Sequence, residues 1–309
     1  MTAMAKKNSR ASIAKRIRNL SDRFRVDRPG RFRLSDVDPG DTAGIEGAEA
    51  AKEALVRGVE RIDDLQARLF AQDRWSVLVV FQAMDAAGKD STIAHVMTGV
   101  NPAGVEVYSF KAPSTTELDH DYLWRHVKCL PERGRIGIFN RSWYEEVLVV
   151  RVHPQILAGQ KVPEGLLGER VWEERFEDIN AFERYLARNG VLVLKFFLHV
   201  SKEEQRKRFL SRIDEPAKNW KFSLGDVEER AHWDDYMHAY ESMIQATSTP
   251  SARWYVVPAD NKWFTRLAVA EALGDAMSRL DLSYPEFDEA KRSELAEARR
   301  RLEREGRGR

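Results

Sequence analysis

A predicted strand, a turn of small residues and a predicted helix follow one another between Val77 and Thr92, and this succession constrains the fold more than any other stretch. The stretch opens with five consecutive apolar residues, Val77 to Phe81, of which three are β-branched. Such a short run is typical of a strand that is buried on both faces of a parallel sheet. Small residues then lead to Gly88 and Lys89, after which apolar residues recur at helical spacing. The chain is therefore predicted to be an α/β protein.

The turn between this strand and this helix has the features of a phosphate-binding loop. Backbone N–H groups at the start of a helix point at anionic oxygens, and Lys89 adds a mobile positive charge. The match to G-x-x-x-x-G-K-[ST] is imperfect, because Ala83 stands at the first glycine and Asp90 follows the lysine. A strand–turn–helix without a ligand is the alternative interpretation. The predicted phosphate-binding residues of the loop are Ala83, Met84, Ala86, Ala87, Gly88, Asp90 and Ser91.

The rest of the chain alternates between apolar runs and helical patterns. Further strands are predicted at residues 105–110, 135–140, 191–200 and 253–258. Helices are predicted at about 45–72, 115–130, 170–188, 201–213, 225–247 and 262–280. Five strands with intervening helices predict a parallel, doubly wound five-stranded sheet with right-handed crossovers. In such a sheet the ligand lies at the carboxyl ends of the strands.

The composition narrows the class of protein. With 309 residues and 43% hydrophobic side chains, the chain can bury a large core. Its 50 lysines and arginines balance 49 acids, so bulk attraction to nucleic acid or to a membrane is not expected. No apolar run approaches the length of about 18 residues that spans a bilayer. The single cysteine, Cys129, excludes an intramolecular disulfide, and we expect a soluble, cytoplasmic protein.

Charge patterns divide the chain into three parts. Residues 1–44 are predicted to be a basic arm and a loop, residues 45–280 the α/β domain, and residues 281–309 a charged C-terminal helix or tail. The first 33 residues hold eleven lysines and arginines against two acids. Such an arm can bind a polyanion, but a solvated or oligomer-contacting tail is the interpretation that we favour.

Polar residues just past the strands are the candidates for chemistry. Asp85 is the predicted ligand of a divalent cation, because Asn140 stands where an acid would follow the strand 135–140. An Asx turn is the alternative role for Asp85. Arg141 can bridge oxygens of two phosphates or form an ordinary salt bridge. Side chains near these positions are predicted to bind a nucleotide, and they are Lys111, Asn140, Glu145 and Glu146.

A basic segment at about residues 206–225 is predicted to be a helical lid. Arg208 and Arg212 are four residues apart, hence on one helical face. Lys218 and Lys221 follow, with Pro216 between them and the helix. A lid of this kind closes over phosphates and excludes water. A solvated helix whose bases pair with neighbouring acids is the alternative.

Six blocks of sequence, taken in order, resemble the family-2 polyphosphate kinases. The first is Phe-Gln-Ala-Met-Asp-Ala-Ala-Gly-Lys-Asp-Ser-Thr, and the blocks lie at residues 81–92, 99–102, 109–114, 118–125, 139–153 and 208–223. The resemblance covers about residues 45–280. It implies a P-loop kinase fold similar to that of thymidylate kinases, inorganic polyphosphate as a substrate, and Mg²⁺ as the cofactor, with Mn²⁺ as an alternative.

The details of two blocks resemble one branch of that family. Ala-Met-Asp-Ala-Ala-Gly-Lys-Asp and Asn-Arg-Ser-Trp-Tyr-Glu-Glu are similar to the branch that phosphorylates both AMP and ADP, with GMP and GDP as further possible acceptors. The resemblance implies catalytic roles for Asp85, Lys89, Arg141 and Arg208, with Arg212 as the second choice for the arginine of the lid. Glu146 departs from the Glu-Asp of many relatives, which leaves its role open.

The predicted function is therefore a reversible, Mg²⁺-dependent transfer of a terminal phosphoryl group from polyphosphate to AMP or ADP by a homo-oligomeric enzyme. Because a phosphate oxygen is already anionic at neutral pH, no general base is needed, and catalysis consists of alignment and charge neutralisation. An ATP-dependent nucleoside monophosphate kinase of the same fold is the first alternative. A polyanion-binding protein without enzymatic activity is the second.

Overall fold

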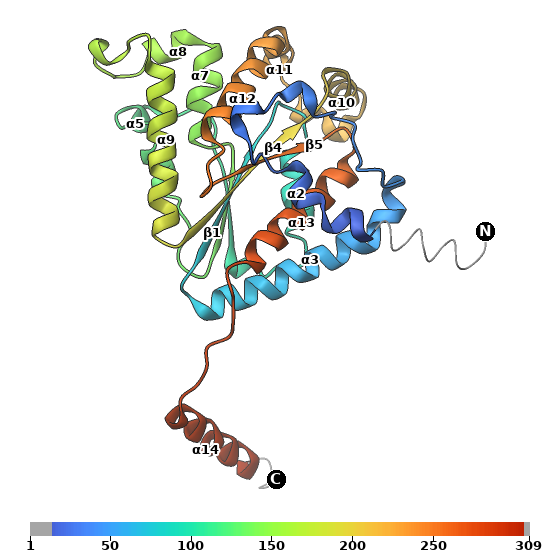
Figure 1. Ribbon diagram of the computed structural model, residues 1–309, viewed down its shortest axis with the longest axis vertical. Helices are drawn as coiled ribbons and strands as arrows, with labels where there is room; N and C mark the ends of the chain where they lie inside the picture. The colour runs from blue at the N-terminus through green and yellow to red at the C-terminus, as the bar shows by residue number, and fades with distance from the viewer. Residues whose placement is uncertain (1–13, 306–309) are drawn as a thin grey trace, which may run out of the picture.

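A five-stranded, wholly parallel sheet lies at the centre of the protein, in a computed structural model that describes residues 14–305 (Figure 1). The strands are β1 (Ser76–Gln82), β2 (Val105–Ser109), β3 (Ile136–Asn140), β4 (Val191–His199) and β5 (Trp254–Pro258). Their order across the sheet is β2-β3-β1-β4-β5. Every residue of β1, β3 and β5 is buried, as expected for strands that helices cover on both faces. The predicted parallel, doubly wound sheet is confirmed.

Helices form a layer on each face of the sheet (Figure 1). On one face, α3 (Gly47–Gln72) packs along α13 (Lys262–Ser278), which also contacts α4 (Lys89–Val96). On the other face, α9 (Val171–Arg188) packs on β4, and α12 (Trp233–Thr247) packs between α9 and the short α7 (Val149–Val152). Because β1 is the third of the five strands across the sheet, the loop that follows it emerges at the middle of the carboxyl edge.

Two helices that the sequence predicts as continuous are broken. The stretch 115–130 forms α5 (Thr115–Leu118) and α6 (Trp124–Val127), because the Asp121 carboxylate accepts hydrogen bonds from the N–H groups of Leu123 and Trp124 and starts a new helix. The stretch 225–247 forms α11 (Leu224–Glu229), a 3₁₀ turn and α12. Ser114 caps α5 and Ser201 caps the helix Lys202–Asp214, and the side chain of each accepts a hydrogen bond from the backbone N–H three residues on.

The N-terminal segment contributes to the core, in contrast to the solvated arm that its charge favours. Helix α2 (Leu20–Phe24) buries Leu20 and Phe24, and Val26 donates from its N–H to the Trp254 carbonyl at 2.9 Å. Arg25 also forms an antiparallel bridge with Tyr255. The segment therefore covers the edge strand β5, which would otherwise present unpaired backbone groups. Residues 1–13 of the predicted arm lie outside the described residues.

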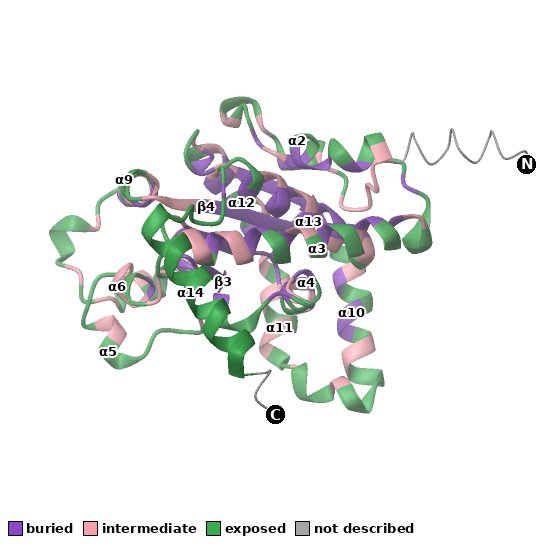
Figure 2. Ribbon diagram, turned by 90° about the horizontal axis from the view of Figure 1, so that it is seen from below, coloured by how far each residue is buried: buried purple, intermediate pink, exposed green. Residues whose placement is uncertain are grey.

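The C-terminal part of the chain leaves the body of the protein. After α13, an extended stretch leads to α14 (Glu289–Glu305), which has no buried residue and lies apart from the sheet (Figures 1 and 2). The stretch predicted as a charged helix or tail therefore contains a helix over most of its described length. None of the helices within residues 14–305 has the length and apolar character needed to cross a membrane.

Candidate active site

A cavity of about 600 Å³ opens at the carboxyl ends of the strands. Most of the residues predicted from the sequence line it: Asp85, Ala86, Gly88, Lys89, Asp90, Ser91, Lys111, Asn140, Arg141, Arg208, Arg212, Lys218 and Lys221. It is also lined by residues that the sequence analysis did not single out, namely Ser109, Phe110, Ala112, Ser211 and Lys262. The remaining predicted residues do not line it, and these are Ala83, Met84, Ala87, Glu145 and Glu146.

The loop after β1 wraps around the side chain of Lys89. Gly88 has a φ of +106°, a conformation that glycine adopts without strain, and this turn starts α4. The Lys89 ammonium donates a hydrogen bond to the Ala83 carbonyl at 2.7 Å. Ala83 and Met84 therefore shape the loop through their backbone, although neither lines the cavity. The arrangement places the start of α4 and one ammonium at the floor of the cavity, where an anion is favoured.

Asp85, Arg141 and Glu145 form a chain of charges beside Lys89. One Arg141 nitrogen lies 2.8 Å from Asp85 Oδ1, and another lies 3.4 Å from Glu145 Oε2. Arg141 has a φ of +67°, a strained conformation for an arginine, which is typical of residues held by their site. Glu145 thus forms an ion pair with Arg141 but does not line the cavity. Arg141 presents its guanidinium directly after β3, as the strand-end rule predicts.

The electrostatics of this cluster favour bound anions. Burial raises the pKa of Asp85, but Lys89, Arg141 and Arg212 together outweigh it and hold the pKa below its ordinary value. Burial also lowers the pKa of Lys89, and Asp85 opposes this effect. The Glu145 pKa is raised by burial despite Arg141. The site therefore holds Asp85 ionised among cations that phosphate oxygens can also pair with.

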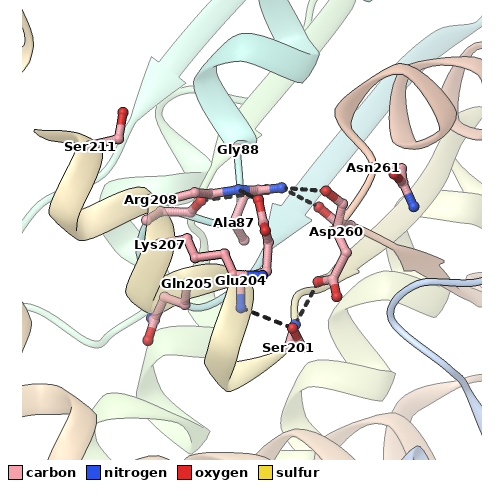
Figure 3. A network of polar contacts seen from close by, with 12 residues as sticks. Ala87, Gly88, Ser201, Glu204, Gln205, Lys207, Arg208, Ser211, Asp260 and Asn261 are labelled. Atoms are coloured by element: carbon pink, nitrogen blue, oxygen red, sulfur yellow. Dashed lines mark hydrogen bonds and ion pairs between the residues drawn. The ribbon is translucent and has the colours of Figure 1, made fainter. Parts of the chain in front are cut away.

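Arg208 forms hydrogen bonds both with the loop after β1 and with the residues that follow β5 (Figure 3). Its Nη1 donates to the carbonyls of Ala86 at 3.0 Å and Ala87 at 2.8 Å, and its Nη2 donates to those of Ala259 at 2.7 Å and Asp260 at 3.0 Å. Its Nε lies 2.8 Å from a carboxylate oxygen of Glu204. These contacts occupy all three nitrogens of the guanidinium, and the side chain is only 8% exposed. Arg208 lines the cavity, yet its partners are backbone carbonyls.

Helix α10 (Lys202–Asp214) carries Arg208 and is itself fixed at the loop. The backbone N–H of Ser201, the residue before the helix, donates to Asp260 Oδ1 at 2.8 Å. One turn further on, the Gln205 amide donates to the Asp85 carbonyl at 2.9 Å. The first turn of α10, which precedes the predicted lid, is therefore held against the loop after β1 and against Asp260.

The cationic side chains further along this segment face the cavity with fewer restraints. Arg212 pairs with Asp226 at 3.2 Å, and Lys218 pairs with Glu215 at 2.6 Å. Both lysines of the 3₁₀ turn Pro216–Lys221 lie in exposed or partly exposed positions at the far end of the helix pair α10 and α11 (Figure 2). This distal part has the position and charge expected of a lid.

Asn140 and Glu146 have different surroundings from each other. The Asn140 amide donates to Asp90 Oδ1 at 2.5 Å and lines the cavity between β2 and α4. Glu146 is turned away from it, because its carboxylate accepts from Arg175 at 3.2 Å and from Gln160 at 2.9 Å. The structure therefore places Asn140, but not Glu146, at the cavity.

Apart from Ser211, which lies within α10, the residues that sequence analysis missed follow the same strand-end rule as those it found. Ser109 ends β2, Phe110 follows it, and Lys262 begins the helix after β5. Lys262 lines the cavity near Arg208 and Lys218, and its pKa is lowered by burial and by these neighbouring cations. Lys262 could have been predicted from the sequence, because it lies about one turn past the end of the last strand.

Comparison with known proteins identifies the family to which this site belongs. A sequence model described as Polyphosphate kinase 2 (PPK2) matches residues 46–284. The chain belongs to the polyphosphate kinase 2 family. The match contains β1 to β5 and every residue that lines the cavity.

Relatives of known name and structure agree with this family. An ADP-polyphosphate phosphotransferase of Rhodopseudomonas palustris is 55% identical over 83% of this chain and 89% of its own length. An AMP/ADP-polyphosphate phosphotransferase of Meiothermus ruber is 47% identical over 87% and 97%. The crystal structure of Polyphosphate Kinase 2 from Arthrobacter aurescens TC1 covers 90% of this chain and 96% of its own, with 40% identity and a TM-score of 0.80. As a polyphosphate kinase 2 with a P-loop kinase fold, the protein is a phosphotransferase.

Proposed function

We propose that this polyphosphate kinase 2 transfers the terminal phosphoryl group of inorganic polyphosphate to AMP and to ADP. The observation that carries the proposal is the cavity itself. It brings the loop after β1 together with several cations, Lys89, Arg141, Arg212, Lys218 and Lys262, which line one space of about 600 Å³. Cations on several sides suit a reaction in which both the donor and the acceptor present phosphate groups.

The transfer needs only one bond to form and one to break. An oxygen of the nucleotide's terminal phosphate attacks the terminal phosphorus of polyphosphate, and the bond from that phosphorus to its bridging oxygen breaks. The shortened polyphosphate leaves with the electron pair as an anion, so no proton has to move. Lys89 and Arg141 hold the transferring group from two sides, which aligns it and neutralises its charge.

The donors of the cavity fit a divalent cation that is held mainly by its substrates. Within residues 14–305 no group of three or more His, Cys, Asp or Glu side chains could enclose a metal. Asp85 offers one carboxylate, whose Oδ1 faces Arg141 and whose Oδ2 has no hydrogen-bond partner among the described residues. Mg²⁺ commonly takes one or two carboxylates together with phosphate oxygens and water. We propose that Asp85 holds Mg²⁺, or Mn²⁺, which would supply further charge neutralisation on the phosphates.

We assign the acceptor to the β2 side of the cavity and the donor to the α10 side. Lys111, Ser109 and the Asn140–Asp90 pair form the first side, where polar groups can position a nucleotide. Arg212, Lys218 and Lys221 form the second side, where the cations follow one another as a linear polyanion requires. GMP and GDP are further candidate acceptors at the same place.

We also propose that the enzyme is a cytoplasmic homo-oligomer, in keeping with its single, half-buried Cys129 and its exposed Tyr284 and Phe287.

The acceptor range is tested by incubating the purified enzyme with polyphosphate, Mg²⁺ and either AMP or ADP, and separating the nucleotides by chromatography. The proposal expects ADP and then ATP from AMP, and ATP from ADP. The two relatives named above differ in this respect, since one name includes AMP and the other does not. Formation of ATP from ADP with no product from AMP would restrict the function to ADP.

A further inference from the structure

A second hollow, of about 240 Å³, lies away from the active-site cavity on the N-terminal segment. Its floor is formed by buried or half-buried apolar residues that include Val26, Val37 and Val256, and its rim holds four arginines and one acid, Asp27. The arginines of the rim are Arg23, Arg25, Arg28 and Arg31. The family match begins at residue 46, so all but one of the residues that line this hollow lie outside it. The activity shared with the family does not account for this feature.

The rim carries positive charge that the protein itself does not neutralise. Arg23 pairs with Asp41 at 2.7 Å, and Arg25 pairs with Asp27 at 2.9 Å. In contrast, the exposed side chains of Arg28 and Arg31 make no hydrogen bond or ion pair with any other residue of the described range 14–305. Two guanidinium groups beside an open hollow are suited to bind an anion, because each offers a planar fork of N–H donors.

The backbone that carries these arginines is fixed to the core on both sides. The Phe24 ring meets the Phe264 ring of α13 edge-on, with centroids 5.7 Å apart. On the other side, the Gln245 amide of α12 donates to the Phe32 carbonyl at 2.8 Å, and the Leu34 N–H donates to Glu241 at 2.7 Å. The arginines are thus held by an ordered segment beside β5 and α12 (Figure 1), not by a mobile tail.

The same segment continues from the hollow to the rim of the active-site cavity. Val256, in the floor of the hollow, precedes the end of β5 by two residues, or roughly 7 Å in an extended strand. At that end, the Asp260 N–H donates to the Pro39 carbonyl at 3.1 Å, and the Asn261 amide donates to the Gly40 carbonyl at 3.3 Å. Lys262, which lines the cavity, comes next in the chain. Positive charge therefore lies at both ends of a short path over the edge of the sheet.

We propose that the arginine hollow is an accessory binding site for polyphosphate, which holds the part of a long donor chain that extends beyond the active-site cavity. The inference rests on the proposed use of polyphosphate as the donor. A linear polyphosphate repeats its negative charge along its length, so one molecule can contact Lys262 at the cavity and the arginines at the hollow. Two linked contacts strengthen binding by raising the effective concentration of the second site. A chain too short to leave the cavity gains nothing from the hollow.

The double variant Arg28→Ala/Arg31→Ala tests this site. For long-chain polyphosphate we expect KM to rise roughly threefold to tenfold, as two exposed charge contacts are lost. For a short polyphosphate that the cavity can hold, KM should stay within about twofold, because such a donor does not reach the hollow and a change of about 0.4 kcal/mol or less corresponds to that factor. The charge reversal Arg28→Glu/Arg31→Glu should enlarge the long-chain effect. The matched control is Arg184→Ala/Arg188→Ala, two exposed arginines on α9, which lies away from α2 (Figures 1 and 2).

The outcomes separate this inference from the proposed function. Equal KM changes for long and short donors, or no change for either, would overturn the accessory site while wild-type transfer from polyphosphate still supports the function. Failure of the wild type to use any polyphosphate would overturn both. Competition by RNA for the arginines, without a dependence of KM on donor length, would mean that the hollow binds nucleic acid and would also overturn the proposal. Thermal unfolding of each variant verifies that its fold is retained.

Discussion

Replacing Arg208 with alanine should unfold the protein at lower denaturant concentration as well as impair transfer. The substitution would leave four backbone carbonyls without their donor, those of Ala86, Ala87, Ala259 and Asp260, and would leave Glu204 without its cation. Removing one partner from a buried charged network costs about 3–5 kcal/mol. Because Arg208 lines the cavity, water can reach part of the gap, and we expect a loss near the lower limit of about 3 kcal/mol.

Urea unfolding of the wild type, Arg208→Ala and Arg208→Lys measures this loss. The lysine variant keeps the charge, but its single nitrogen cannot span the two pairs of carbonyls, so it should recover little stability. Arg212→Ala is the control, because Arg212 is 21% exposed and its pair with Asp226 should contribute about 1 kcal/mol or less. If Arg208→Ala lost activity at an unchanged unfolding midpoint, Arg208 would act on the substrate directly, as the family resemblance implies, and not through the loop.

Three further predictions concern the loop and the pH dependence of stability. Lys89→Ala should lower kcat/KM at least roughly a hundredfold, because a charge clamp in a water-excluded site contributes about 3 kcal/mol or more; a steady-state assay that finds a smaller loss than roughly tenfold would remove Lys89 from the mechanism. Asp85→Asn should shift the Mg²⁺ titration of activity to higher concentration, because a charged ligand becomes neutral; an unchanged curve would place the metal elsewhere. Burial lowers the pKa of His126 and of His199 from 6.5 to about 4. Between these pH values each histidine binds a proton in the unfolded chain but stays neutral in the folded chain. This contribution to stability is complete above pH 6.5 and is lost as the pH falls toward 4. The unfolding midpoints of the wild type and of His199→Gln should therefore converge at the acid end of that window. Parallel curves for the two proteins would refute the assignment.

The elements of the sheet could be predicted because their signals are local. Five apolar runs gave five parallel strands, and β1 was the clearest since all seven of its residues are buried. The strand-end rule then located Asp85, Lys89 and Arg141, because the carboxyl ends of neighbouring parallel strands meet at one edge whatever the details of packing.

Contacts between distant segments could not be read from the sequence. Four of the partners of Arg208 are backbone carbonyls on two loops. The pattern of side chains in a sequence does not predict which backbone oxygens will accept hydrogen bonds from a guanidinium group. Glu145 and Glu146 are adjacent in sequence, yet one supports Arg141 and the other pairs with Arg175, since the 3₁₀ turn sends them in different directions.

The N-terminal segment shows the limit of charge as a predictor. Its many arginines favour a solvated arm, whereas Leu20, Phe24 and Val26 decide the structure by packing against α13 and β5. Three apolar side chains are a weak signal in a basic sequence, but the edge strand that they cover makes their burial favourable. The predicted helix at 115–130 is broken for a different reason, because the Asp121 side chain accepts hydrogen bonds from backbone N–H groups and so competes with the regular helix.

The choice of phosphoryl donor tests the account most directly. The enzyme is incubated with Mg²⁺ and AMP, and either purified polyphosphate or ATP is offered as the donor in the absence of the other, with Lys89→Ala measured in parallel. We expect transfer from polyphosphate with a higher kcat/KM than from ATP, and loss of that transfer in the variant. Efficient transfer from ATP together with no transfer from polyphosphate would contradict the account and would make the protein an ATP-dependent nucleoside monophosphate kinase of the same fold.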